Sequence, residues 1–437
     1  MGPDKKTTNW LYEETKRWIQ NGIINNSQAE TIKGLYPLPK AERPWGLLVF
    51  SGIGAVIIGL GIILLFAYNW EKMTKFSKLA VIFVALIVSH SIGVRLFLRS
   101  ERFKGLGEAI AVLGTMLFGA GIWLVASIYH IEEHYPNAFF VWALGALLLA
   151  LVMPSVIQGI LAAVLLAIWA GAEAIEFGQP TLWAIPLLLS IFVLAHQRTS
   201  KLLLVVVMLS LWVTTGFVAG SYLENELILL ILLSLSACYM AAGYVSSWYG
   251  SFRESKGIYN SLGFAGYIVF LYTLSFREMA EEVYKTTPKM SSGQLLCLLL
   301  PVALALAGWV WALLKMFRTG EFKKKYEILL IPLVLIFGYL HLLTGLGLSI
   351  VAIAVFNTVF LTQSVLMMGR GCREGQMAPT VVGSLMLIAL TIGRYVDLFE
   401  SLVARGVVFI VVGAILFAEG IFYIRSRKKL RAKTETE

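Results

Sequence analysis

Long apolar runs separated by short polar breaks dominate the chain from residue 46 onwards. A helix that crosses the bilayer core needs about 20 mostly apolar residues. We therefore expect an all-α polytopic membrane protein, with a transmembrane domain over 46–424. The runs predict about fourteen transmembrane helices, at 46–69, 76–98, 105–129, 136–153, 155–175, 181–197, 201–222, 226–248, 257–276, 292–317, 326–345, 347–368, 377–394 and 403–424.

Two of the breaks between these runs are narrow. One is at Pro154 and the other at Gly345-Leu346-Gly347. Each break either separates two helices or lies inside one broken or re-entrant element, because irregular backbone is tolerated at membrane depth where protein or a water-filled cavity surrounds it. The sequence leaves both alternatives open.

Residues 1–45 differ from the rest, because polar side chains alternate there with apolar residues at helical spacing. The apolar residues of the first predicted helix are Trp10, Leu11, Trp18 and Ile19. Gly22 is typical of a helix end, and Ser27 with Glu30 has the spacing of a capping box that starts a second helix. Pro37 and Pro39 end that helix. We expect a cytoplasmic amphipathic hairpin, which packs on the membrane domain or on its own copy in a homo-oligomer.

Positive charge fixes the expected orientation. With the N-terminus inside, 28 of the 36 Lys and Arg residues fall on the cytoplasmic side and 8 on the outer side. Such an asymmetry orients a membrane protein, so we expect both termini inside and a basic cytoplasmic tail over 425–437. One wrongly split helix would invert every later loop and spoil this distribution, so the charges also support an even number of helices. The same charges lie in short interhelical breaks, which excludes the soluble basic face that nucleic-acid binding needs.

Composition narrows the function classes. The chain is 58% hydrophobic and 14% charged, whereas soluble domains are about a quarter charged. The longest polar break after residue 45 is about 277–291, so no soluble catalytic domain is inserted and an enzyme is not expected. The three cysteines, Cys238, Cys297 and Cys372, have no metal or redox spacing. We expect no metal and no cofactor, and the lipid bilayer as partner.

Polar residues inside the apolar runs are the first candidates for function, because burying them in hydrocarbon costs free energy. The deepest are His90, Gln158, His341, Asn357 and Gln363. The alternative reading of each is ordinary packing. The sequence has neither the run of intramembrane acids expected of a proton pump nor an arginine ladder. A second candidate group, at the outer end of the last two runs, is a charged network of Arg394, Asp397, Glu400 and Arg405.

An outer loop carries the sequence His130-Ile-Glu-Glu-His134, which matches an inverted zinc-protease motif. That chemistry also needs helical placement and a third ligand, so we interpret the segment as a solvated acidic loop. A weak metal or proton-sensing site is the alternative. Glu173 and Glu176 lie three apart at another outer helix end, and we interpret them as a solvated pair.

Motifs in the first third of the chain resemble those of a known family. They are Ala67-Tyr68-Asn69-Trp70, Gly105-Leu-Gly107-Glu108-Ala109, Phe118-Gly-Ala-Gly121, Ser127-Ile-Tyr129-His130-Ile131 and Trp142-Ala-Leu-Gly145. Over about residues 10–155 the chain is similar to the bacterial predicted membrane proteins called domain of unknown function 2157. The resemblance implies a bacterial inner membrane, a membrane-anchored partner with a GDYXXLXY motif, and no particular activity. The matching positions include Asn69, Trp70, Glu108, Tyr129 and His130.

Two hypotheses for function follow. The first is transport or flipping of a small or lipid-linked solute, indicated by the helix number, the minimal loops and the deep polar groups. The second is a non-transporting scaffold or assembly factor that binds a partner protein. A cavity that reaches the midplane and is lined by His90, Gln158 or Asn357 would favour transport, and a solid bundle with an apolar exposed face would favour the scaffold.

Overall fold

The computed structural model shows a chain in which every described regular element is a helix. The residues that it describes are 5–36, 73–99, 103–131, 134–223, 227–249, 252, 254–284, 291–320, 326–344, 349–397, 410, 412–415 and 417–418. The chain divides into two units, Met1–Ala80 and Val81–Glu437. Each unit is described by itself.

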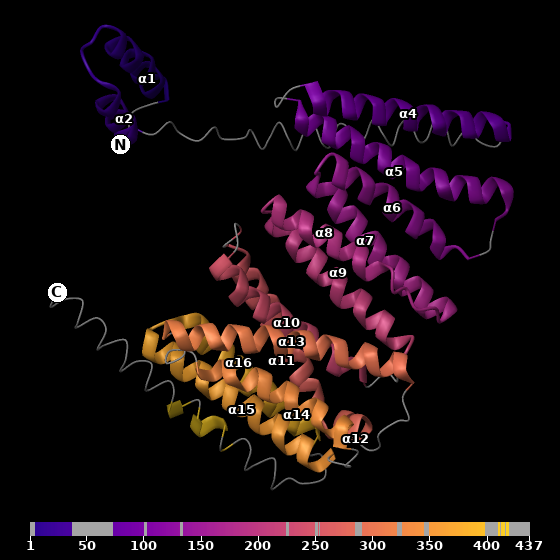
Figure 1. Ribbon diagram of the computed structural model, residues 1–437, viewed down its shortest axis with the longest axis vertical. Coiled ribbons are helices and arrows are strands. Elements are labelled where there is room, and N and C mark those ends of the chain that lie inside the picture. The colour runs from indigo at the N-terminus through magenta and orange to yellow at the C-terminus, as the bar shows by residue number, and fades with distance from the viewer. Residues whose placement is uncertain are drawn as a thin grey trace. The chain divides into compact units, whose positions relative to one another are not determined.

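The described helices are labelled in chain order in Figure 1. Their bounds are α1 Lys5–Gln20, α2 Asn26–Leu35, α4 Lys75–Arg99, α5 Lys104–Tyr129, α6 Pro136–Val152, α7 Val156–Ala172, the π-helical turn η1 Glu173–Phe177, α8 Ala184–Gln197, α9 Lys201–Gly220, α10 Ile228–Tyr249, α11 Ser255–Leu274, α12 Arg277–Tyr284, α13 Ser292–Thr319, the 3-10 turn η4 Tyr326–Leu329, α14 Leu330–Thr344, α15 Ser349–Glu374 and α16 Met377–Asp397.

The first unit contains the hairpin that the sequence predicts. α1 and α2 pack against each other, and the hydroxyl of Tyr12 donates a hydrogen bond to the carbonyl of Lys33 over 3.1 Å. Gly22 follows the end of α1 with a φ of 71°, a backbone conformation that glycine adopts without strain. Thr15 on α1 and Ala29 on α2, both small, are the buried described side chains of this hairpin.

The start of α2 differs from the sequence prediction. The capping box is formed by Asn25 and Gln28, not by Ser27 and Glu30. The Asn25 side chain accepts from the Gln28 amide over 2.8 Å, and the Gln28 side chain accepts from the Asn25 amide over 3.0 Å. Asn caps a helix as well as Ser does, and Gln serves at the third position as Glu does. The helix therefore begins earlier than predicted, at Asn26.

In the second unit, each predicted run between residues 76 and 394 coincides with a helix. Among the described residues, nine helices are long and apolar enough to cross a membrane, and three shorter apolar helices accompany them. The break at Pro154 separates two helices, α6 and α7. The break at 345–347, the run 46–69 and most of the run 403–424 lie outside the described residues.

Two elements depart from the predicted spans. α15 continues beyond residue 368 to Glu374, and Gly375 ends it with a φ of 68°. Polar residues extend a helix without cost once it emerges into water, so hydropathy alone placed its end too early. Within the polar break 277–291, the helix α12 buries Ala280, Val283 and Tyr284 against the bundle.

Described contacts between the ends of neighbouring helices lie at two opposite ends of the second unit. At one end Lys201 and Glu254 form an ion pair, and the Ser155 hydroxyl donates to Glu108. We call this the basic end, because described Lys and Arg residues gather there at the helix ends: Arg95, Arg99, Lys104, Arg198, Lys201, Lys256, Lys315, Arg318, Arg370 and Arg373. At the opposite end the Gln294 side chain donates to the carbonyl of Tyr222 over 2.7 Å.

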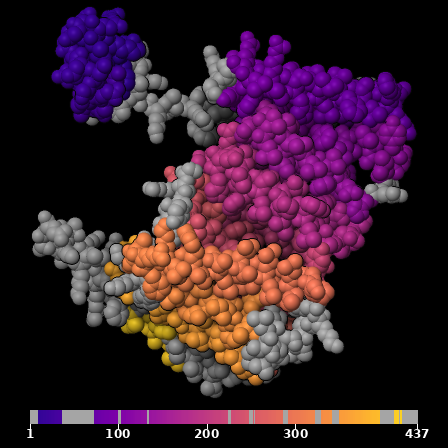
Figure 2. Space-filling view, viewed as in Figure 1, coloured from indigo at the N-terminus to yellow at the C-terminus, as the bar shows by residue number. Residues whose placement is uncertain are grey.

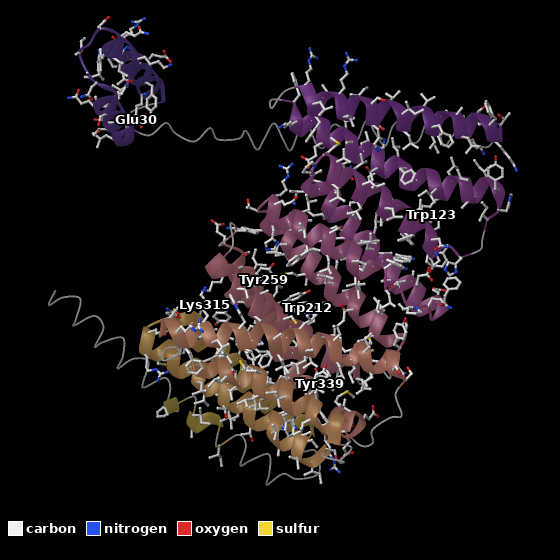
Figure 3. The ribbon with its side chains drawn as sticks, viewed as in Figure 1. Glu30, Trp123, Trp212, Tyr259, Lys315 and Tyr339 are labelled. Carbon is white, nitrogen blue, oxygen red and sulfur yellow. The ribbon has the colours of Figure 1, made fainter. Side chains whose placement is uncertain are left out.

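Buried apolar side chains form two main core clusters in this unit. One comes mostly from α6 to α9, and the other from α10 to α16. Side chains fill the spaces that the ribbon leaves between neighbouring helices (Figure 2). Within the second cluster, the hydroxyl oxygens of Ser234 and Tyr339 lie 2.9 Å apart. Tyr339 is labelled in Figure 3.

Small residues allow α4 and α5 to approach closely. A Cβ added to Gly107 would lie 2.5 Å from the backbone nitrogen of Phe97, and one added to Gly93 would lie 2.9 Å from that of Ala111. Real side chains do not tolerate such distances, so these glycines are required where the two backbones meet. The small-residue pattern of 105–129 thus serves helix packing.

Candidate functional site

A pocket of about 450 Å³ lies among α10, α11, α14 with η4, and α15, near the basic end. Its apolar wall includes Met240, Tyr244 and Phe264. Its polar lining consists of Asn260, Ser261, Gln363, Arg370, Glu374 and Gln376. An apolar cavity with a few convergent polar groups is the usual form of a small-molecule site.

α15 supplies one polar edge of this pocket because of its helical periodicity. Gln363, Met367, Arg370 and Glu374 follow one another at intervals of three or four residues. Residues at this spacing share one face of an α-helix. Gln363 lies deepest, while Arg370 and Glu374 occupy the last turns of the helix. The pocket therefore changes from charged at the basic end to uncharged at depth.

Two buried oxygens at this depth have no hydrogen-bond partner among the described residues. They are Oε1 of Gln363 and Oδ1 of Asn260. Gln363 is only 3% exposed, and an unsatisfied buried polar group costs about 1–3 kcal/mol. A bound molecule that donates hydrogen bonds would remove this cost if the two side-chain amides turned toward the pocket. Gly243 leaves room for the Asn260 amide, since a Cβ there would lie 2.6 Å from Oδ1.

Of the residues predicted from the sequence, Gln363 is the one that lines this pocket. The sequence did not indicate three others, Asn260, Arg370 and Glu374. A single amide such as Asn260 in an amphipathic run gives no signal. The two charged residues were interpreted as part of a connection between helices. The spacing of Gln363, Arg370 and Glu374 would have joined them to one face had the helix been extended past 368.

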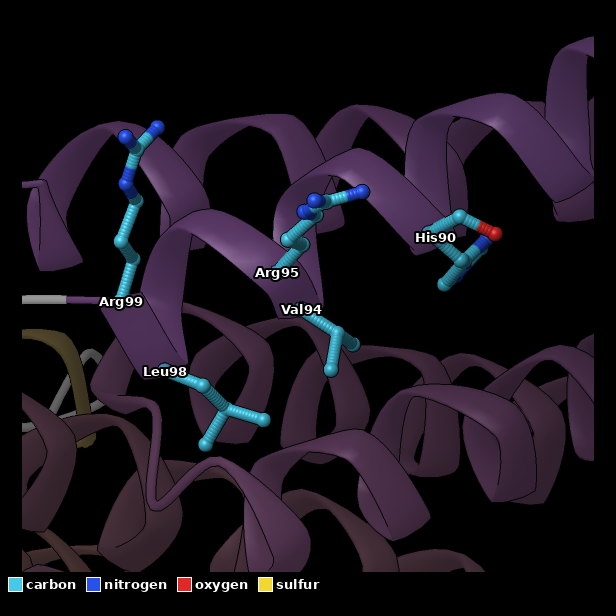
Figure 4. Close-up of a pocket in the computed structure, with 6 residues that line it drawn as sticks. His90, Val94, Arg95, Leu98 and Arg99 are labelled. Carbon is cyan, nitrogen blue, oxygen red and sulfur yellow. The ribbon is translucent and has the colours of Figure 1, made fainter.

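His90 lines a separate open groove of about 880 Å³, whose described lining comes entirely from α4. Val94, Arg95, Leu98 and Arg99 follow His90 along it (Figure 4). Nδ1 of His90 donates to the carbonyl of Leu86, one turn earlier, over 3.0 Å. This histidine is thus bonded to its own helix.

Gln158 is buried in a polar contact between α5 and α7. Its Nε2 donates to Oγ1 of Thr115 over 2.8 Å, and Oγ1 donates to the carbonyl of Ala111 over 3.0 Å. The indole of Trp142 donates to the carbonyl of Thr115 over 2.8 Å, which brings in α6. Gln158 is fully buried, so this network joins three helices rather than lining a cavity.

Glu108 has a hydrogen-bond partner near the basic end. Its Oε1 accepts a hydrogen bond of 2.5 Å from the Ser155 hydroxyl. Ser155 also caps the N-terminus of α7. The α5–α7 contact is therefore polar both at its end and at its middle.

Asn357 and Arg394, from two separate predicted sets, converge on Ser275 at the end of α11. Nδ2 of Asn357 donates to the Ser275 carbonyl over 3.0 Å, and Nη2 of Arg394 donates to its hydroxyl over 3.2 Å. The Arg394 guanidinium also lies 4.8 Å from the Phe276 ring centroid. The rest of the predicted network, the Asp397 side chain with Glu400 and Arg405, lies outside the described residues, as does the side chain of His341.

At the end opposite the basic end, the interpretation of Glu173 as a solvated residue is wrong. Glu173 is 4% exposed. Its Oε1 lies 2.8 Å from Nε2 of His134 and accepts from the Trp169 indole over 3.1 Å. Glu173 is the first residue of the π-helical turn η1, and such turns are frequent at functional sites. The spacing of Glu173 and Glu176 alone did not indicate that Glu173 would be buried next to a histidine.

The solvated neighbour Glu176 affects Tyr135. Loss of solvent contact, followed by the negative charge and hydrogen bond of Glu176, raises the pKa of Tyr135 above its ordinary value. His134 packs on Phe177 with ring centroids 4.2 Å apart. The histidine, the tyrosine and the π-helical turn thus form one cluster.

The zinc-protease spacing does not form a described metal site. His130 ends α5 in a left-handed conformation with a φ of 53°, and Glu133 lies outside the described residues. Among the described residues, no group of three or more His, Cys, Asp or Glu could hold a metal ion. Of the other motif positions, Tyr129 is exposed, whereas Asn69 and Trp70 are not described.

Comparison with known proteins finds a family match over the first third of the chain. No curated protein and no solved structure matches the chain. A family model described as predicted membrane protein, DUF2157, matches residues 16–159. With its candidate spans, the chain is a multi-pass membrane protein. The resemblance carried by the sequence motifs is thereby confirmed: residues 16–159 match the DUF2157 family of predicted membrane proteins.

Proposed function

We propose that this protein binds a small or lipid-linked solute within its helical bundle and moves it across the bacterial inner membrane. The observation that carries the proposal is the pocket among α10, α11, α14 and α15, where the buried oxygens of Gln363 and Asn260 lack described partners. Unsatisfied polar groups inside a membrane domain are expensive. A solute that donates hydrogen bonds is the simplest compensation.

The proposed orientation places this pocket on the cytoplasmic side. Positively charged connections are retained in the cytoplasm, and the pocket lies near the basic end. Both termini and the N-terminal hairpin are then inside. A solute would meet Arg370 and Glu374 first. The Gln363 amide would follow about 10 Å beyond Arg370, at 1.5 Å per helical residue.

Polar groups continue along the same two helices beyond the pocket. α11 and α15 pack against each other. They hold Asn260 and Gln363 at the pocket, and Ser275 and Asn357 nearer the opposite end. From Glu374 to Asn357, α15 spans about 25 Å at 1.5 Å per residue, most of the bilayer core. This series supports a polar route between α11 and α15.

The experiment compares purified protein with a plugged variant in proteoliposomes. Vesicles are loaded with the small-molecule extract of bacterial cells, and mass spectrometry measures which compounds leave. Ser261→Trp fills the pocket from an exposed lining position, and Val310→Trp is its control on an exposed face of α13. We expect loss of particular compounds from wild-type and Val310→Trp vesicles and their retention by Ser261→Trp. Wild-type vesicles no leakier than protein-free ones would refute transport.

The packing of Gln158 and Asn357 favours the alternative, a scaffold or assembly factor. Transport through the middle of the bundle would place these residues at a cavity, but both are engaged in helix-to-helix hydrogen bonds. The partner would be a membrane-anchored protein of the GDYXXLXY type. Crosslinking in cells followed by mass spectrometry tests this. Recovery of such a protein, together with no transport activity, would establish the scaffold.

A further inference from the structure

The N-terminal hairpin exposes three large apolar side chains at one of its ends. Trp10, Leu35 and Tyr36 are 59%, 70% and 42% exposed. We call these residues the open-end patch. Another exposed apolar residue, Ile23, lies in the turn between α1 and α2. Large apolar and aromatic side chains left exposed together indicate a contact with another surface.

The contact between Tyr12 and Lys33 shows that the patch lies at one end. The hydroxyl of Tyr12 bonds to the carbonyl of Lys33, and the Lys33 ammonium lies 5.9 Å from the centroid of the Tyr12 ring. Because the two helices are antiparallel, Trp10 is level with Leu35, away from the turn. The chain leaves the hairpin at this same end.

The interior of the hairpin cannot cover the patch. The described residues buried between the helices are the small Thr15 and Ala29. The hydroxyl of Thr15 is occupied by the carbonyls of Leu11 and Tyr12. Two short helices with such a narrow contact leave no space for an indole or a leucine side chain, so the cover must come from outside the hairpin.

The sequence after the hairpin places lipid close to the patch. Nine residues, 37–45, separate it from the apolar run that begins at Gly46. Even fully extended, nine residues span no more than about 30 Å. The open-end patch is therefore held near the membrane surface, where tryptophan and tyrosine are the side chains that membrane proteins use as anchors.

The charges at this end complement an anionic surface. Lys33 lies beside the patch, and Lys40, Glu42 and Arg43 follow it in the sequence, so positive charge remains in excess. The acidic residues of α1 are neutralised locally, since Glu13 pairs with Lys16 over 2.8 Å and Glu14 pairs with Arg17 over 3.5 Å. Basic residues next to a membrane are attracted by acidic phospholipids.

We propose that the open-end patch docks in the headgroup region of the membrane that the protein itself spans, on acidic phospholipid. The aromatic and leucine side chains enter the interface, and the basic residues remain at the phosphates. This inference is independent of the proposed transport function, since it uses neither the pocket nor a solute.

Spin labels test the proposal in the full chain. Cys238, Cys297 and Cys372 are replaced by alanine, and one label is placed by Leu35→Cys or, as the control on the charged face, by Glu13→Cys. The protein is reconstituted in nanodiscs of phosphatidylcholine with phosphatidylglycerol. We expect the label at 35 to be more accessible to oxygen and several-fold less accessible to a nickel chelate than the label at 13. Equal, fully aqueous accessibility at both sites would overturn the proposal.

Hydrogen exchange provides a second measurement that does not depend on labels. We expect amides at 26–36 to exchange several-fold more slowly in discs with phosphatidylglycerol than in phosphatidylcholine alone. The double variant Trp10→Ser with Leu35→Ser should remove this difference, and Ile23→Ser should keep it. Protection that depends on two copies per disc, with dipolar coupling between labels at 35, would show that a second copy covers the patch and would overturn lipid docking.

Discussion

Nε2 of His134 lies 2.8 Å from Oε1 of Glu173, although 39 residues separate them in the chain. The contact ties the N-terminus of α6 to the π-helical turn after α7. The same carboxylate accepts from the Trp169 indole. Two side chains, those of His134 and Trp169, are thus held by a single carboxylate.

Replacing Glu173 tests how much this contact stabilises the fold. Glu173→Ala leaves the Trp169 indole and the His134 ring without their acceptor, and an unpaired buried polar group costs about 1–3 kcal/mol. We expect a destabilisation of that size in reversible unfolding in detergent. Gln179→Ala, at an exposed nearby position, is the control and should change stability by less than about 0.5 kcal/mol. Equal effects of the two variants would contradict the role given to Glu173.

The close approach of α4 and α5 predicts different effects at two glycines of the same helix. Gly107→Ala places a methyl group against the Phe97 backbone, and overpacking of this kind costs about 1–3 kcal/mol. Gly105→Ala meets no atom within 4 Å and should be neutral or slightly stabilising. Thermal unfolding of both variants measures the difference. A Gly107→Ala protein as stable as Gly105→Ala would show that the helices are farther apart.

The bond between Gln158 and Thr115 should contribute little, despite its burial. Interhelical hydrogen bonds in membrane proteins average about 0.6 kcal/mol and reach about 1.7 kcal/mol. Oε1 of Gln158 has no described partner, which offsets part of the gain. We expect a double-mutant cycle of Gln158→Leu and Thr115→Val to give a coupling below about 1 kcal/mol. A coupling of several kcal/mol would mean that the whole network with Trp142 acts as a unit.

The N-terminus of α2 distinguishes the observed cap from the one that the sequence suggested. Asn25→Ala should cost about 1 kcal/mol, the usual loss when a capping side chain is removed. Ser27→Ala should cost little, because Ser27 lies inside the helix. Amide exchange at residues 26–30 reports the local stability. A larger effect at Ser27 than at Asn25 would restore the sequence-based assignment.

Hydropathy predicted the helices well because a membrane span must be long and apolar, and α4 to α11 and α13 to α16 follow the predicted runs closely. It failed where other forces decide. α15 extends to Glu374 because a helix need not end where its apolar run ends. α12 forms in a polar break because Val283 and Tyr284 find a place in the core. The count of fourteen spans stays a prediction, since two of the runs lie largely outside the described residues.

Less of the candidate site could be predicted from the sequence. Gln363 stood out because an amide in an apolar run is rare, but its neighbours Asn260 and Tyr244 come from other helices, and only packing brings them together. Asn357 and Arg394 were both selected, although nothing in the sequence indicated that Ser275 would join them. Glu173 is buried against His134 and Trp169, and the sequence did not indicate that His134, 39 residues away, would lie beside it.

The contacts at Ser275 constrain how the bundle can move. Asn357 from α15 and Arg394 from α16 both hold the end of α11 there. The pocket lies at the other end of these helices. If α15 tilted against α11, the axis of the rotation would therefore lie near Ser275, at one end of both helices. Small rotations there would widen or narrow the mouth at Arg370 and Glu374 while the far end stays closed.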